Sequence, residues 1–84
     1  MSYQVEIKKA AQKALKKIPD PDYSRVKAAI YALAEDPRPP GYIKLKGRDG
    51  YRIRQGNYRI IYEIQDGALL VTVVTLGHRK DVYD

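Results

Sequence analysis

Residues 51–62 (YRIRQGNYRIIY) constrain the fold of this chain most strongly. Two runs of alternating residues flank Gly56-Asn57, and such a pair between two alternating runs is a signal for a two-residue β-hairpin turn. Pairing the strands across this turn places Arg54 opposite Arg59. Because successive side chains of a strand point to opposite faces of the sheet, the stretch predicts a hairpin with one apolar and one basic face.

The two faces of this hairpin differ in chemistry. The apolar face carries Tyr51, Ile53, Tyr58, Ile60 and Tyr62. The other face, called the arginine face below, carries Arg52, Arg54 and Arg59. Like charges directly opposite each other destabilise a sheet, so a sequence selected for folding alone would more often place an acid at one of these positions. The arginine face therefore predicts binding of an anion from outside the protein.

Length and composition narrow the class of protein. A chain of 84 residues predicts one small domain, residues 1–84, that can bury a core of its own. The absence of cysteine excludes disulfides and cysteine-based metal sites and favours a reducing, cytoplasmic setting. Neither an apolar run of ~20 residues nor a signal-peptide pattern occurs, so we expect a soluble protein without a membrane partner.

The positive charge is concentrated beside the hairpin. The formal net charge is +6, and residues 42–59 hold six basic side chains against the single acid Asp49. This concentration favours a polyanionic partner, either nucleic acid or an acidic protein, although a basic surface can also serve solubility alone. The loop before the hairpin contributes Lys44, Lys46 and Arg48. We expect these three to contact phosphate, or else the loop is an ordinary one with Leu45 as its anchor.

The N-terminal half predicts a strand and two helices. Residues 3–7 alternate as a strand does, with Tyr3, Val5 and Ile7 inward. Residues 8–17 predict a helix whose apolar stripe contains Ala11, Ala14, Leu15 and Ile18. Asp20 is expected to cap a second helix that has Pro21 at its first position and ends near Glu35 or Asp36, before Pro37. The lysines of both helices are interpreted as a solvated face, with nucleic-acid contact as the alternative.

The C-terminal half predicts two more strands. The second hairpin strand should run to about Gln65, and Asp66-Gly67 signals a type I′ turn. A last strand over residues 68–76 would then place Val71 and Val73 beside Tyr62 and Ile60, and Val74 opposite Arg59. Gly77 is expected to change the chain direction and bring His78, Arg79 and Tyr83 toward the arginine face. The fold class predicted is α+β: a strand, a two-helix hairpin and an antiparallel β-meander, with the helices packed on one face of the sheet.

Three stretches, in this order of elements, match a known family. They are YRIR at residues 51–54, YRIIYEI at 58–64 and VTLGHRKDVY at 74–83. Together they resemble the RelE branch of the RelE/ParE toxin superfamily of bacterial and archaeal type II toxin–antitoxin systems. The resemblance implies a RelE-like fold and an endoribonuclease that cuts mRNA in the ribosomal A site. It also implies a RelB-like antitoxin as partner, and a toxin–antitoxin complex that binds operator DNA.

The same resemblance implies roles for particular residues. The reaction is attack of a ribose 2′-hydroxyl on the adjacent phosphate, and the family's basic and aromatic site residues fall on Arg52, Arg54, Arg59, Arg79 and Tyr83. Well-studied relatives carry lysine at the first two of these positions. Because arginine stays protonated, neither Arg52 nor Arg54 can serve as a general base.

The chemistry itself requires a base near the 2′-oxygen, positive charge on the phosphate oxygens and an acid for the leaving 5′-oxygen. Arg54, Arg59 and Arg79 can supply the charge as planar multi-donor groups, and Arg52 is assigned to phosphate positioning.

His78, the single histidine, is a candidate base or acid, or else it fixes the tail or faces solvent. Tyr83 is a candidate for proton transfer or base stacking, or else it packs on the sheet. With a single histidine, scattered acids and no glycine-rich phosphate loop, the sequence predicts neither metal nor nucleotide cofactor.

Two other functions remain compatible with these residues. A ParE-like toxin would bind and inhibit DNA gyrase without cutting nucleic acid. A non-catalytic domain would bind RNA or an antitoxin and do nothing further.

Overall fold

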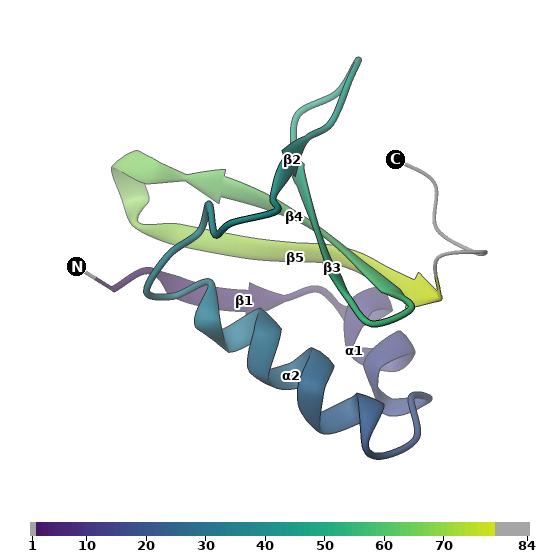
Figure 1. Cartoon of the computed structure of the whole chain (residues 1–84). Helices are drawn as coiled ribbons and strands as arrows, with labels where there is room; N and C mark the ends of the chain where they lie inside the picture. The colour runs from purple at the N-terminus through teal and green to yellow at the C-terminus, as the bar shows by residue number, and fades with distance from the viewer. Residues whose placement is uncertain (1, 79–84) are drawn as a thin grey trace.

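Residues 2–78 are described by a computed structural model, which combines a five-stranded sheet with two α-helices. In chain order the elements are β1 (Gln4–Ile7), α1 (Lys9–Lys16), α2 (Asp22–Ala32), β2 (Ile43–Lys44), β3 (Tyr51–Gln55), β4 (Tyr58–Gln65), the 3₁₀ turn η1 (Asp66–Ala68) and β5 (Leu70–His78). The strand order is β1-β5-β4-β3-β2, with β1 parallel to β5 and the other neighbours antiparallel. Figure 1 shows both helices on one face of this sheet, so the predicted α+β class is confirmed.

The β3–β4 hairpin has the predicted register. Arg54 lies opposite Arg59, and Ile53 lies opposite Ile60. Gly56, at the start of the turn, has a φ of 60°, a left-handed conformation that glycine adopts without steric cost. The hairpin therefore has the apolar face and the arginine face that the alternation predicted.

The main core lies between the helices and the apolar face of the sheet. The helical stripe predicted from spacing is buried at Ala11, Leu15 and Ile18. The sheet contributes the buried side chains Ile53, Ile60, Tyr62, Val71, Val73 and Leu76. Fully burying one such side chain contributes roughly 1.5–3 kcal/mol, so this layer contact holds the helices against the sheet.

A second, smaller cluster lies on the arginine face. Leu45 and Ile61 are both buried there, and the Leu45 N–H donates a hydrogen bond of 3.0 Å to the Gly50 carbonyl oxygen. Gly50 has a φ of 130°, and a Cβ at this position would lie 3.3 Å from Leu45 Cδ1. Leu45 thus anchors the loop before the hairpin, as one of the two interpretations of this loop predicted. Within this segment Ile43 and Lys44 form β2, which pairs with β3. A strand of two residues is too short to be predicted from alternation.

The second helix differs from its prediction at both ends. Its N-cap is Pro21, without a side-chain hydrogen bond, so the prediction of Asp20 as the cap is wrong. Asp20 Oδ1 instead accepts a hydrogen bond of 3.0 Å from Ser24 Oγ. The helix ends at Ala32 and the chain continues in turns, where Ala34 and Glu35 donate to carbonyls three residues earlier. These tighter bonds end the α-helix before the proline does.

The β4–β5 connection is longer than the predicted type I′ turn. Residues Asp66–Ala68 form a 3₁₀ turn, and Leu69 follows with a φ of 50°. Gln65 therefore pairs with Leu70, two positions beyond the predicted partner. Because a shift of two keeps every side chain on its face, Val71 and Val73 still point toward the helices, opposite Ile64 and Tyr62 and not opposite Tyr62 and Ile60.

A β-bulge then shifts the pairing once more. The irregularity lies between Ile61 and Tyr62, which pair with Thr75 and Val73. As a result Gly77, and not Val74, lies opposite Arg59. β5 runs without a break to His78, so the predicted end of the strand at residue 76 and the change of direction at Gly77 are wrong. Among the helices of residues 2–78, none combines the length and the apolar character that crossing a membrane requires.

Candidate phosphate-binding site

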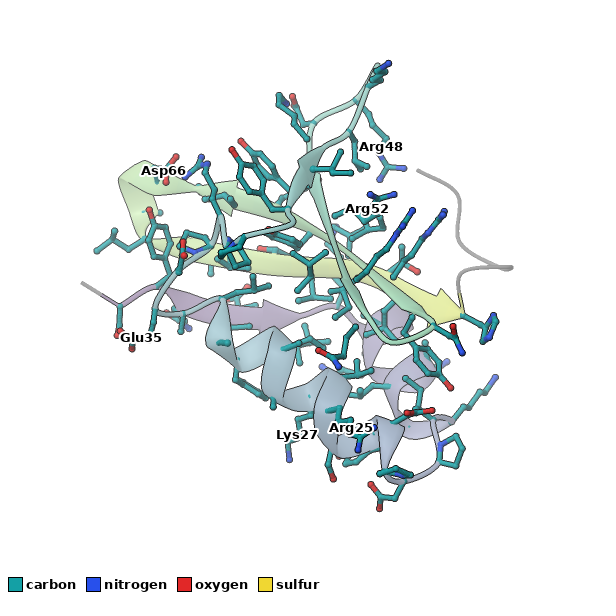
Figure 2. All side chains as sticks on the ribbon, viewed as in Figure 1. Arg25, Lys27, Glu35, Arg48, Arg52 and Asp66 are labelled. Carbon is teal, nitrogen blue, oxygen red and sulfur yellow. The ribbon has the colours of Figure 1, made fainter. Side chains whose placement is uncertain are left out.

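The arginine face gathers three guanidinium groups on two neighbouring strands. Arg54 and Arg59 are directly opposite each other, and Arg52 lies two residues before Arg54 on the same side of β3. This side of the sheet faces away from the helices. In Figure 2 the labelled side chains of Arg48 and Arg52 lie on that side. The hairpin register therefore places the three arginines on one face, as the alternation predicted.

The three arginines differ in exposure. Arg52 retains 5% of its accessible surface and Arg59 is partly buried, and the Nε atoms of both are removed from solvent. Arg54 is exposed, and within residues 2–78 it makes no hydrogen bond or ion pair. Arginine keeps its charge even when it is buried. The face thus offers two positionally restrained cations beside one that is accessible to a ligand.

Gly77 leaves the position opposite Arg59 without a side chain. The bulge in β5 sets this pairing, because it inserts one residue between the partners of Ile61 and Tyr62. Glycine inside a strand often marks a place where another group approaches the backbone closely. Sequence reasoning missed this role of Gly77, since the signal became readable only once the length of the β4–β5 turn was known.

His78 lies on the other side of the sheet. It pairs with Tyr58, and the two rings meet edge to face with centroids 5.8 Å apart. Since Tyr58 shares a face with Ile60, the imidazole lies on the helix side and lines a groove against α1. The expectation that the tail turns His78 toward the arginine face is wrong. Arg79 and Tyr83, the other tail candidates, lie outside the described residues.

The basic loop is divided between the two sides. Lys44 pairs with Tyr51, and its Nζ lies 5.3 Å from the centre of the Tyr51 ring. Its ammonium group therefore lies outside the arginine face, and the expected contact of Lys44 with phosphate stays a prediction. Lys46 and Arg48 are both exposed in the loop, and Figure 2 shows Arg48 on the same side of the sheet as Arg52.

A different arginine is engaged in holding the fold together. Arg38 donates to both carboxylate oxygens of Asp66, at 3.2 and 3.0 Å, and its guanidinium lies over the Tyr51 ring. Tyr3 Oη also donates to Asp66, at 2.6 Å. Hydrogen bonds from Arg38, then Tyr3, hold the pKa of Asp66 below its usual range. This cluster could not be predicted from local sequence patterns, because its members come from four separate segments.

Metal ligands do not cluster in the part of the chain described: no group of three His, Cys, Asp or Glu side chains could hold an ion there. The chemistry available to the arginine face is electrostatic. Guanidinium groups donate planar, charge-assisted hydrogen bonds that fit phosphate oxygens. The face can therefore bind a phosphate and stabilise additional negative charge on it.

Comparison with known proteins identifies the class. The sequence profile of a family described as the ParE toxin of type II toxin–antitoxin system, parDE, matches residues 5–83. The chain therefore belongs to this toxin family, within the RelE/ParE superfamily. A RelE-like toxin protein of Escherichia coli is 30% identical over 89 residues, covering 100% of this chain and 93% of that protein. A RelE toxin of Methanocaldococcus jannaschii is 30% identical over 87 residues, covering 99% of this chain and 97% of that one.

The structural comparison agrees. The archaeal RelE–RelB complex from Pyrococcus horikoshii contains a chain that superposes with a TM-score of 0.84 at 33% identity, covering 98% of this chain and 100% of that one. Within the superfamily this protein lies in the RelE branch: it is a RelE-type toxin of a type II toxin–antitoxin system. The resemblance read from the three sequence stretches is confirmed.

Proposed function

We propose that this toxin is a metal-independent endoribonuclease that cuts mRNA in the ribosomal A site. The observation that carries the proposal is the pairing of Arg54 with Arg59 opposite a glycine. Two guanidinium groups lie across one strand pair, and Gly77 places no side chain opposite Arg59. Guanidinium groups gathered on one face donate charge-assisted hydrogen bonds that fit phosphate oxygens.

In the proposed reaction the 2′-oxygen attacks the adjacent phosphorus and the bond to the 5′-oxygen breaks. The products are a 2′,3′-cyclic phosphate and a 5′-hydroxyl. The 2′-proton passes to a base, and the leaving 5′-oxygen takes a proton from an acid. Negative charge grows on the non-bridging oxygens during the attack, and preorganised cations stabilise it most strongly in the transition state.

We assign each candidate residue a role according to its position. Arg59 is the restrained donor and Arg54 the accessible one, while the nearly buried Arg52 positions the phosphate. Arg79 and Tyr83 are assigned from the family resemblance, Arg79 to phosphate charge and Tyr83 to proton transfer. His78 is left out of the chemistry because it lies on the helix side. The few side chains available to read bases make positioning of the message by the ribosome part of the proposal.

The test is a translation reaction with purified ribosomes, in which cuts on the message are mapped by primer extension. Arg59→Ala is expected to lower the cleavage rate by on the order of 10²-fold, the usual effect of removing one preorganised donor. Arg25→Ala, an exposed arginine on α2, is the matched control and should cut like the wild type. If both variants cut equally well, the site assignment is wrong.

An antitoxin is proposed as the partner of this toxin. The P. horikoshii relative was solved as a RelE–RelB complex, and the local excess of positive charge fits an acidic partner. We expect a RelB-like antitoxin to block cleavage when added in equimolar amount, and the complex to retard operator DNA in a gel-shift assay. Unaltered cleavage with antitoxin present contradicts the pairing.

A second candidate function is inhibition of DNA gyrase. The observation that favours it is the family profile, whose description names the ParE toxin. A supercoiling assay with purified gyrase separates the two functions. Inhibition of supercoiling together with intact message supports the gyrase function, and the reverse result supports the nuclease.

A further inference from the structure

A groove on the helix side of the sheet is not used by the proposed reaction. It has a volume of about 530 Å³ and lies between α1 and the last residues of β5. Its floor is apolar and includes Ala14, Ile18 and Leu76. Its rim carries Lys13 and Lys17 from the helix, together with Tyr58 from the end of β4 nearest the hairpin turn.

The helix beside this groove is strongly basic. Residues 8–17 contain five lysines and no acid. Lys9, Lys13 and Lys17 recur every four residues, so they form one stripe on the helix surface, and like charges at this spacing destabilise a helix. Lys8 and Lys9 lie at the helix N-terminus, where the helix dipole disfavours cations, whereas Lys13, Lys16 and Lys17 lie at its C-terminal end, where the dipole favours them. The helix thus presents a row of cations that a polyanion can bind.

The groove also offers aromatic side chains to a ligand. The Tyr58 and His78 rings meet at an interplanar angle of 76°, and both side chains remain partly exposed. Unpaired bases of RNA are commonly bound against aromatic rings, and cations beside the rings hold the flanking phosphates. An apolar floor with one aromatic wall and two lysines at its rim fits a nucleotide.

We propose that this groove binds an unpaired nucleotide of RNA, with its base against Tyr58 and its phosphates on Lys13 and Lys17. Tyr58 directly precedes Arg59 in β4, so the groove and the arginine face include neighbouring residues on opposite sides of one strand. An RNA strand that leaves the arginine face can reach the groove by passing the Gly56-Asn57 turn. The inference rests on the proposed function, which supplies the RNA; the RNA is either the message itself or a loop of ribosomal RNA.

The experiment measures affinity as a function of salt for two probes. One probe is a 12-nucleotide 2′-O-methyl RNA, which cannot be cut because its 2′-oxygen is blocked, and the other is purified ribosomes without message. Lys13→Gln/Lys17→Gln is compared with Arg25→Gln/Lys27→Gln, which removes two exposed charges from α2. Loss of two phosphate contacts lowers the slope of log K against log salt by about 1–2 for the α1 variant, whereas the α2 variant keeps the wild-type slope.

The two probes separate the sources of RNA. A lower slope with both probes assigns the groove to a single strand such as the message, and a lower slope with ribosomes alone assigns it to ribosomal RNA. Equal slopes for the α1 and α2 variants overturn the inference. So does a result in which the α1 variant loses affinity for the antitoxin alone, because the groove is then a protein-docking surface.

The failure of this inference differs from failure of the proposed function. If the wild type cuts message and the α1 variant binds both probes normally, the nuclease stands and the groove assignment fails. If the wild type cuts nothing while the α1 variant shows the lower slope, the groove assignment stands and the nuclease fails. Thermal unfolding of each variant verifies that it is folded before either comparison.

Discussion

Tyr62→Phe is the substitution that most directly tests how the connector between α2 and β2 is held. Tyr62 has no accessible surface, and its hydroxyl donates a hydrogen bond of 2.7 Å to the carbonyl oxygen of Pro37, which is also buried. Phenylalanine keeps the ring and its packing, including the contact with Tyr51 at 5.9 Å between ring centroids. The change therefore isolates one buried hydrogen bond.

The expected loss of stability follows from the Pro37 carbonyl oxygen, which the substitution leaves without its donor. A buried acceptor without its donor costs about 1–3 kcal/mol, more than the net contribution of an average hydrogen bond. For a domain of this size a loss of ~2 kcal/mol lowers Tm by roughly 8–16 °C. Urea unfolding followed by circular dichroism should show a lower midpoint with an unchanged m-value.

Tyr31→Phe is the control, because Tyr31 is 50% exposed and a surface change of this kind usually stays within about 0.5 kcal/mol. If Tyr62→Phe costs no more than Tyr31→Phe, the hydroxyl does not anchor the connector.

The same hydroxyl predicts an alkaline pH dependence. Burial is the main cause that raises the pKa of Tyr62, since the phenolate would have to form in the core. A group whose folded-state pKa is raised contributes stability that is fully present below the unfolded value of about 10 and is lost as pH rises through the folded value. The wild type should therefore lose stability above about pH 10 more steeply than Tyr62→Phe. Parallel stability curves for the two proteins contradict this explanation.

Two further substitutions test the site and the polar cluster. Gly77→Val adds a side chain opposite Arg59 on a strand that tolerates β-branched residues. We expect Tm to stay unchanged while the cleavage rate falls by on the order of 10²-fold. Full activity would show that no ligand needs the position that the valine side chain occupies. Asp66→Asn removes a carboxylate whose pKa is lowered by Arg38 and Tyr3, so wild-type stability present above about pH 4 is lost as pH falls. Tm measured from pH 2 to 6 should lack this component in the variant, and identical profiles would exclude it.

The parts of the fold that local chemistry determines could be read from the sequence. A two-residue turn fixes the register of its hairpin, which is why β3 and β4 pair as predicted around Gly56-Asn57. The β4–β5 register could not be read, because Asp66-Gly67 also fits a longer turn and nothing marks Leu69 as left-handed. The parallel pairing of β1 with β5 is likewise a tertiary contact without a local signal.

The candidate site was likewise predictable only where local sequence patterns determine it. The arginine face was predictable, because alternation along a strand assigns Arg52, Arg54 and Arg59 to one side. The side of the sheet on which His78 lies was not, since it depends on how far β5 continues. The side on which Lys44 lies could not be predicted either, because it depends on the pairing of β2 with β3, which turns Lys44 toward Tyr51.

The bulge in β5 connects the core to the site. If the pairing of Tyr62 with Val73 continued without it, Leu76 would lie opposite Arg59, on the face away from the helices. With Val74 as the extra residue, Leu76 lies opposite Ile60 in the core, 3% exposed, and Gly77 lies opposite Arg59. Burying a leucine contributes roughly 1.5–3 kcal/mol, enough to offset the ~1 kcal/mol of a disturbed ladder hydrogen bond. The energy that places a leucine in the core is therefore also the energy that places Gly77 opposite Arg59.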